Sequence, residues 1–151
     1  AEALKARWPT ARFQFAGPVS SAADSVAREE LGRAVEDLGH LEDVRPALAA
    51  CHVFVYPSYG EGMPRAVLEA LATGRPVVTT RTPGCKETVD EVVNGCLVPP
   101  ADARELARAM ESFLARPELL PIAERAARLK AQRRFDVRDV NAAMIRILGL
   151  A

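Results

Sequence analysis

The sequence has few of the residues that bind metal ions or form disulfides. Its 151 residues contain two histidines, His40 and His52, and three cysteines, Cys51, Cys85 and Cys96. Neither histidine has a second ligand at the spacing of a zinc site, and no two cysteines form a C-x-x-C pair. An odd number of cysteines argues against a disulfide-stapled secreted protein. We therefore expect no metal site and a reducing, cytoplasmic compartment.

The chain also lacks an excess of charge and any long apolar run. Twenty Lys and Arg balance twenty Asp and Glu, so the formal net charge is zero. A neutral molecule exerts no general attraction on polyanions, and we expect no nucleic-acid partner. No run approaches the roughly 18 apolar residues of a membrane-spanning helix, and the first residues, AEALKARWPT, do not resemble a signal peptide. With 49% hydrophobic and 26% charged residues, the chain 1–151 is predicted to form one globular domain.

Several catalytic and nucleotide-binding motifs are absent. There is no G-x-x-x-x-G-K-[ST] phosphate loop and no G-x-S-x-G nucleophile elbow, which excludes P-loop nucleotidases and serine hydrolases of that type. No D-x-D occurs, which removes one common way of holding a divalent metal on a nucleotide diphosphate. Gly60 and Gly62 form a G-x-G, but Arg65 stands where the dinucleotide-binding fingerprint requires a third glycine.

The sequence does contain short apolar runs that alternate with segments of helical period. This pattern predicts an α/β fold, a Rossmann-like three-layer domain with a mostly parallel sheet. The run 53–56 is continuously apolar, as expected of a strand buried on both faces, and is predicted to be the central strand. A helical tail is predicted to follow Asp102. The other predicted strands cover residues 13–16, 35–38, 76–80 and 96–98.

The predicted helices have recognisable starts and ends. Asp43, Asp102 and Asp136 are candidate N-caps, Asp102 with Glu105 resembles a capping box, and Gly74 ends the helix that begins at Pro64. Residues 21–34 are predicted to form a surface helix. Two apolar stripes are predicted to be buried, the last of them against this domain or an absent one: Leu106, Met110, Phe113 and Leu114, and Val140, Met144, Ile147 and Leu148.

The junction after the strand 53–56 is the candidate binding site. In an open α/β sheet, ligands bind beyond the carboxyl ends of the strands. The helix that starts at Pro64 leaves backbone N–H groups unpaired at Met63, Arg65 and Ala66, and the helix dipole makes this end positive, so it suits a phosphate. Gly60 and Gly62 allow a tight turn and a close approach of the ligand.

Two carboxylates flank this helix start. Glu69 lies far enough along the helix to accept hydrogen bonds from a ribose next to a bound diphosphate, and Glu61 lies where the far end of the ligand would be. Structural alternatives stay open for both. Glu69 and Arg65, spaced i, i+4, could form only a solvated ion pair, and Glu61 could only complement the helix dipole.

The ordered segments EGMPRAVLEALATGRPVVTT, TPGCKETV and NGCLVPPAD, with Glu61 and Glu69 in E-x7-E spacing, resemble the C-terminal, nucleotide-sugar-binding half of group 1 glycosyltransferases of GT-B fold. The resemblance continues upstream through GHLEDVRPALAACHVFVYPS and downstream to RRFDV. It implies transfer of a sugar, of hexosyl type, from a UDP- or GDP-sugar donor to an acceptor hydroxyl, with retention and without a metal or other cofactor.

The resemblance also implies roles for single residues. Glu61 would be the catalytic-centre residue that touches the donor sugar, and Glu69 would bind the ribose. Gly39 and His40 would line the base pocket. The diphosphate would be held at the start of the helix by Gly62, Met63, Arg65 and Ala66.

The departures from the family pattern point to a part of a longer enzyme. Such enzymes have two Rossmann-like halves, and the strand and loop with the Arg and Lys that neutralise the diphosphate would precede this chain. His52 replaces a usual Asp, and Pro64 has no N–H for a phosphate. We expect an absent N-terminal domain as a partner and an isolated fragment without turnover.

The resemblance further suggests polysaccharide or glycolipid acceptors and a cytoplasmic enzyme, with peripheral association at the inner face of the membrane as a further expectation. Two other functions stay open: a sugar-nucleotide epimerase and a non-catalytic nucleotide-binding module.

Overall fold

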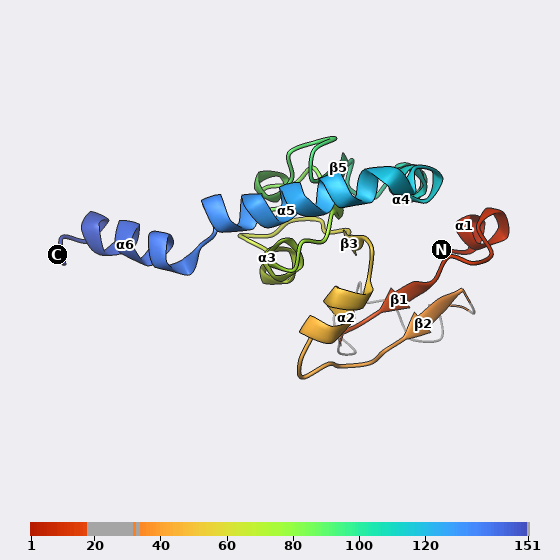
Figure 1. Ribbon diagram of the computed structural model, residues 1–151, viewed down its shortest axis with the longest axis horizontal. Coiled ribbons are helices and arrows are strands. Elements are labelled where there is room, and N and C mark those ends of the chain that lie inside the picture. The colour runs from red at the N-terminus through yellow and green to blue at the C-terminus, as the bar shows by residue number, and fades with distance from the viewer. Residues whose placement is uncertain (18–31, 33, 151) are drawn as a thin grey trace. The chain divides into compact units, whose positions relative to one another are not determined.

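The computed structural model describes residues 1–17, 32 and 34–150, and these divide into two compact units, Ala1–Pro46 and Ala47–Ala151 (Figure 1). The surface helix predicted over 21–34 falls largely outside the described residues. Each unit is α/β and is described by itself.

The first unit is built on two parallel strands. Helix α1 (Glu2–Arg7) precedes β1 (Phe13–Phe15), which pairs with β2 (Val35–Asp37) so that Phe13 lies opposite Val35. At the surface, Arg12 and Gln14 both donate to the Glu36 carboxylate, at 2.7 and 2.9 Å. The guanidinium of Arg12 is the main reason why the pKa of Glu36 is lowered.

The second unit contains a three-stranded parallel sheet in the order β3-β4-β5. The strands are β3 (Phe54–Tyr56), β4 (Val77–Thr80) and β5 (Gly95–Val98). The prediction that 53–56 is the central strand is wrong for this sheet, because β4 lies in the middle and all four of its residues are buried. The residues of β3 are only half-buried, which fits its place at one edge of the three strands.

Helices cover this sheet and continue to the C-terminus. Helix α2 (Arg45–Ala50) leads into β3, and α3 (Arg65–Ala72) connects β3 to β4. A short 3-10 turn, η2 (Lys86–Thr88), precedes β5, and α4 (Ala103–Ala115), η3 (Pro117–Leu119), α5 (Leu120–Arg134) and α6 (Val137–Ile147) follow it. The α/β class, the parallel strands and the helical C-terminal segment are as predicted.

Most of the predicted capping residues cap the helices as expected. Asp43 accepts from the Arg45 N–H at 3.0 Å, and Asp136 accepts from the Arg138 N–H at 2.9 Å. The Asp102 carboxylate accepts from the N–H groups of Arg104 and Glu105, but the Glu105 side chain pairs with Arg108, so no reciprocal capping bond is observed. At the end of α3, Gly74 has φ +76° and so takes the left-handed conformation that ends the helix.

The core of the second unit lies between the sheet, α3 and α5. Val67 and Leu71 of α3 and Val77 and Val78 of β4 are fully buried. Three alanines of α5 pack on this core because they share one helical face: Ala123, Ala127 and Ala131. Arg75, which lies between α3 and β4, pairs through its guanidinium with Glu124 of α5 at 3.2 Å.

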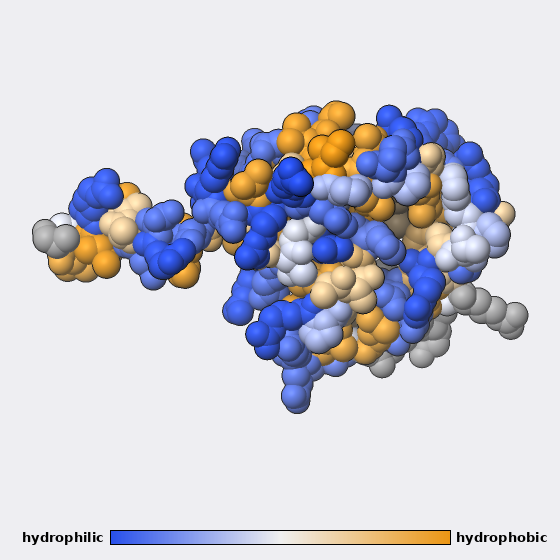
Figure 2. Space-filling view, viewed as in Figure 1, coloured by the Kyte–Doolittle hydropathy of each residue, from blue (hydrophilic) through white to orange (hydrophobic). Residues whose placement is uncertain are grey.

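The two apolar stripes of the C-terminal segment are less buried than predicted. The stripe of α4 is only half-buried, and no residue of this helix is fully buried. All residues of α6 are exposed, and hydrophobic side chains are visible along it in Figure 2. Among the described residues, no helix has both the length and the apolar character needed to cross a membrane.

Candidate functional site

The site lies at the edge of the sheet where β3 and β4 end. Because these strands are parallel, the loop after β3 (residues 57–64) and the loop after β4 (residues 81–85) emerge side by side. The prediction that the segment after residues 53–56 leads into a helix that begins at Pro64 is confirmed, because Pro64 is the N-cap of α3 and the helix starts at Arg65.

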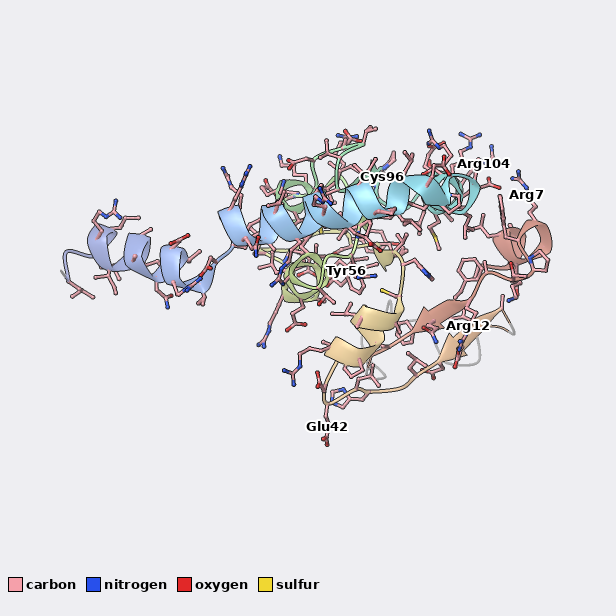
Figure 3. The ribbon with its side chains drawn as sticks, in the orientation of Figure 1. Arg7, Arg12, Glu42, Tyr56, Cys96 and Arg104 are labelled. Carbon is pink, nitrogen blue, oxygen red and sulfur yellow. The ribbon has the colours of Figure 1, made fainter. Side chains whose placement is uncertain are left out.

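The Glu61 carboxylate is held by two hydroxyl groups that share one of its oxygens. Tyr56, the last residue of β3 (Figure 3), donates its hydroxyl to Glu61 Oε1 at 2.8 Å, and the Ser58 hydroxyl reaches the same oxygen at 3.4 Å. No hydrogen bond from the described residues reaches Oε2. Glu61 is half-buried, and among the described residues no buried side-chain oxygen lacks a hydrogen-bond partner, so the unpaired Oε2 is exposed to solvent.

Threonine hydroxyls at the end of β4 fix the loop that follows β3. The buried Thr80 accepts from the Ser58 N–H at 3.2 Å, donates to the Ser58 carbonyl at 2.5 Å and lies 3.2 Å from the Thr82 hydroxyl. One residue earlier in β4, the Thr79 hydroxyl donates to the Tyr56 carbonyl at 2.6 Å. The backbone on both sides of Pro57 is therefore tied to β4 by side chains as well as by strand pairing.

Gly84 permits the closest approach of the two loops. It has φ +78°, and a Cβ at this position would lie 2.4 Å from the carbonyl oxygens of both Glu61 and Gly62. No other residue type fits this space without moving one backbone segment. The position of Glu61 thus depends on a glycine that lies 23 residues further along the chain.

The Tyr56 phenol has an altered acidity. Burial is the main cause, followed by the hydrogen bond to the Glu61 carboxylate, and together they raise the pKa of Tyr56 to about 12. The phenol therefore stays protonated near neutral pH and acts as a hydrogen-bond donor to Glu61.

The start of α3 presents free N–H groups, as predicted. Pro64 is the N-cap, and its carbonyl accepts from the N–H groups of Val67 and Leu68 at 3.0 and 3.2 Å. Within the described residues no acceptor contacts the N–H groups of Met63, Arg65 or Ala66. Such an end carries a partial positive charge and suits an anion.

Glu69 forms an ion pair with Arg65, which is the structural alternative to ribose binding. The Arg65 Nε atom donates to Glu69 Oε1 at 2.9 Å, and the Arg65 side chain is 90% exposed. An exposed i, i+4 pair contributes only about 0.3–0.5 kcal/mol, so a ligand can replace it at small cost. The role of Glu69 in ribose binding stays a prediction.

The predicted base-pocket residues belong to the first unit. Gly39 follows β2, has φ +68° and donates its N–H to Asp37 Oδ1 at 2.8 Å, while its carbonyl accepts from the Gly17 N–H at 2.9 Å. His40 comes next and is exposed. Both therefore follow the carboxyl end of the parallel strand β2, and their role in a base pocket stays a prediction.

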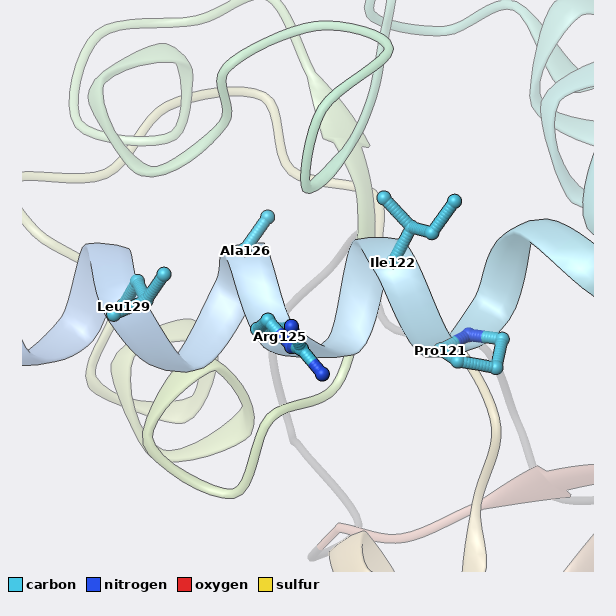
Figure 4. Close-up of a pocket in the computed structure, with 5 residues that line it drawn as sticks. All are labelled: Pro121, Ile122, Arg125, Ala126 and Leu129. Carbon is cyan, nitrogen blue, oxygen red and sulfur yellow. The ribbon is translucent and has the colours of Figure 1, made fainter.

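Two other features lie outside this site. Among the described residues, no group of three His, Cys, Asp or Glu side chains is arranged to hold a metal ion. A shallow apolar pocket occurs on the outer face of α5, and all its lining residues come from that one helix (Figure 4): Pro121, Ile122, Arg125, Ala126 and Leu129. It contains none of the predicted site residues.

Sequence reasoning from residue types alone missed Tyr56, Thr80 and Gly84 as parts of the site. The sequence predicts Tyr56 only as part of a buried strand, Thr80 ends a different strand, and Gly84 lies in the loop that follows it. A signal was present, because hydroxyl residues and a Pro-Gly at the end of a second parallel strand lie at the same edge of the sheet as the end of the first.

Together, the parallel α/β architecture, the open helix start and the oriented carboxylate define a domain suited to phosphate-containing ligands. A family model described as "Glycosyl transferases group 1" matches residues 1–116. The chain belongs to this family.

Individual relatives agree with the family match. The chain is 37% identical over 106 residues to D-inositol 3-phosphate glycosyltransferase of Saccharomonospora viridis, covering 70% of this chain and 24% of that protein. It is also 37% identical over 114 residues to a putative colanic acid biosynthesis glycosyltransferase of Escherichia coli, WcaL, covering 70% and 28%. The chain thus spans about a quarter of the length of these relatives.

Solved structures share the fold. Sucrose-phosphate synthase of Thermosynechococcus elongatus has a TM-score of 0.84 and 27% identity, covering 98% of this chain and 40% of that one. Anabaena HepE in complex with UDP-glucose has a TM-score of 0.73 and 30% identity, covering 80% and 34%. The predicted Rossmann-like fold of GT-B glycosyltransferases is confirmed by these neighbours.

Proposed function

We propose that this chain is the donor-binding half of a retaining, metal-independent hexosyltransferase that transfers a sugar from a UDP- or GDP-sugar to an acceptor hydroxyl. The observation that carries the proposal is the Glu61 carboxylate, held with one oxygen free beside the unpaired N–H groups at the start of α3. Family membership and the UDP-glucose complex of a neighbour support the same function.

Each residue has a part in this proposal. The N–H groups of Met63, Arg65 and Ala66 bind the diphosphate, and Gly62 leaves room for it. These fixed dipoles also stabilise the negative charge that develops on the leaving diphosphate. The free oxygen of Glu61 accepts a hydrogen bond from a hydroxyl of the donor sugar, and Glu69 binds the ribose after leaving Arg65. Gly39 and His40 bind the base.

The partners follow from the same proposal. The nucleotide sugar is a substrate, and no cofactor is needed. A preceding GT-B domain of the same protein supplies the acceptor site, and the acceptor is a growing polysaccharide or a glycolipid, in line with the name of the E. coli relative. The enzyme is cytoplasmic and associates peripherally with the inner face of the membrane.

Thermal unfolding of the full-length protein with UDP, GDP, ADP and NAD tests donor binding. A ligand that binds only the folded state at about 100 times its Kd stabilises it by about 2.7 kcal/mol, which raises the Tm of a cooperative unit of the size of residues 1–151 by roughly 5–11 °C. We expect the rise for one nucleoside diphosphate and not for NAD.

The variants Glu69→Ala and Glu105→Ala make the test specific. Each removes the acidic partner of an exposed ion pair near a helix start, Arg65–Glu69 on α3 and Arg108–Glu105 on α4. We expect Glu69→Ala to abolish the ligand-induced Tm rise and Glu105→Ala to retain it. Equal rises in both variants contradict a ribose role for Glu69, and the absence of any rise in the wild-type protein contradicts donor binding.

Product analysis tests the chemistry itself. With a donor of the selected base and an acceptor oligosaccharide, proton NMR should show that the anomeric configuration of the donor is retained in the product. Turnover should persist in excess EDTA. An inverted product refutes retention, and loss of activity that added Mg²⁺ or Mn²⁺ restores refutes metal independence.

A further inference from the structure

We propose that Tyr56 is a positioning residue: its hydroxyl engages one oxygen of Glu61 so that the other oxygen faces the donor sugar. The proposal rests on the proposed function, in which Glu61 contacts that sugar. Tyr56 itself touches no substrate and acts only through Glu61.

The geometry around the carboxylate carries the proposal. Both hydroxyl donors, Tyr56 at 2.8 Å and Ser58 at 3.4 Å, meet at Oε1, and no donor among the described residues reaches Oε2. A carboxylate has acceptor capacity on both oxygens. One side is therefore occupied by the protein, and the accessible side retains its full capacity for a sugar hydroxyl.

Tyr56 is rigid enough to act as this anchor. Its backbone lies in β3, paired with β4, and its carbonyl accepts from the Thr79 hydroxyl at 2.6 Å. Its ring lies nearly parallel to that of Phe54, with an interplanar angle of 18° and a centroid distance of 6.2 Å. Ser58, by contrast, holds Glu61 through a longer bond and shares its hydroxyl with the Gly60 backbone.

A fixed carboxylate favours binding for an entropic reason. A free glutamate side chain samples several rotamers and loses this freedom when a ligand engages it. In this site the rotamer is already selected before the donor arrives. The benefit is limited to the part of the ligand that Glu61 touches, which is the sugar and not the nucleotide.

The variant Tyr56→Phe tests, in the full-length protein, whether Tyr56 affects binding of the sugar and not of the nucleotide. It removes only the hydroxyl and keeps the ring against Phe54. The probes are UDP-glucose and UDP, replaced by GDP-mannose and GDP if the nucleotide panel selects guanine. By calorimetric titration we expect binding of the sugar nucleotide to weaken by up to about tenfold, because the Glu61 side chain must then be immobilised when the sugar binds. We expect binding of the free nucleoside diphosphate to change less than about twofold.

Tyr59→Phe is the matched control. It makes the same chemical change three residues away, at a side chain that is 77% exposed and has no hydrogen bond to the described residues. We expect this variant to bind both probes like the wild-type protein. A Tyr56→Phe effect no larger than that of Tyr59→Phe overturns the proposal.

Glu61→Ala separates the positioning role from the proposed function. If Tyr56 acts through Glu61, Tyr56→Phe has no further effect in the Glu61→Ala background, as a double-mutant cycle shows directly. Additive effects overturn the positioning role, as does an equal loss for both probes in Tyr56→Phe. If Glu61→Ala does not discriminate between the two probes, the proposed contact of Glu61 with the sugar fails instead.

Discussion

Replacing Gly84 by alanine should displace the loop that carries Glu61. A Cβ at this position would lie 2.4 Å from the carbonyl oxygens of Glu61 and Gly62, whereas ordinary contacts begin near 3.4 Å. The two backbone segments must therefore separate by about 1 Å. Because Gly84 is buried and its neighbours here are backbone atoms, no side-chain rotation can relieve the contact.

Two separate terms set the size of the effect. The left-handed φ of +78° costs alanine about 1–2 kcal/mol, partly offset by about 0.4–1 kcal/mol from the less flexible unfolded chain. Forcing the loops apart adds about 1–3 kcal/mol, the usual cost of overpacking. We expect Gly84→Ala to lower the free energy of unfolding by about 3 kcal/mol in total.

Gly74→Ala isolates the conformational term. Gly74 has nearly the same φ, +76°, but the nearest atom to its added Cβ is 3.4 Å away. We expect Gly74→Ala to lower the free energy of unfolding by about 1 kcal/mol. Gly60→Ala, with open space and no positive φ, should change stability by less than about 0.5 kcal/mol.

Urea unfolding of the three variants measures these differences, provided that the m-value is unchanged. The reasoning is refuted if Gly84→Ala and Gly74→Ala lose the same stability within about 0.5 kcal/mol. At temperatures where Gly84→Ala remains folded, its turnover should fall by up to about 100-fold, since a displacement of about 1 Å at a reacting group has this effect.

Three further predictions concern residues of the same unit. Val92 has φ +65° and is 95% exposed, so Val92→Gly should raise the free energy of unfolding by about 1 kcal/mol in urea, whereas Val93→Gly should lower it. The pKa of Tyr56 is about 12 in the folded protein and about 10 in the unfolded chain. The protonated phenol therefore contributes fully to the free energy of unfolding below about pH 10, and this contribution is lost between about pH 10 and 12. Tyr56→Phe should remove this part of the fall in stability at alkaline pH, as measured by urea unfolding. Gly62→Ala should keep wild-type stability but weaken UDP-glucose binding measured by calorimetry, and unchanged binding would contradict a close approach of the donor.

The features that the sequence predicted well are local. The helix start at Pro64, the helix end at Gly74 and the caps at Asp102 and Asp136 each depend on a few neighbouring residues. Strand positions were within one residue for the same reason, since each apolar run is bounded by its own turn signals. The Glu61–Glu69 spacing and the parallel strands predict a candidate site at the edge of the sheet where β3 and β4 end, and the structure places Glu61 and the start of α3 there.

The features that the sequence did not predict depend on which helices, strands or loops pack against one another. That β4 and not β3 is central follows only from the pairing of three strands. The half-burial of α4 depends on how much of its stripe the sheet covers, which the helical period does not specify. The contact of Gly84 with residues 61 and 62 joins two loops, so the glycine appears in the sequence only as part of a turn.

The glycines of the site show why fold and function place different demands on the same residue type. Gly84 is required by the fold, through its φ and through its contact with the Glu61 loop. Gly60 and Gly62 are not required by the fold, because neither has a positive φ and a Cβ on either would meet none of the described residues within 4 Å. The expectation that they permit a tight turn is therefore not the reason for glycine there. Free space above the backbone, next to the open oxygen of Glu61 and the unpaired N–H groups of α3, has value only if a ligand occupies it.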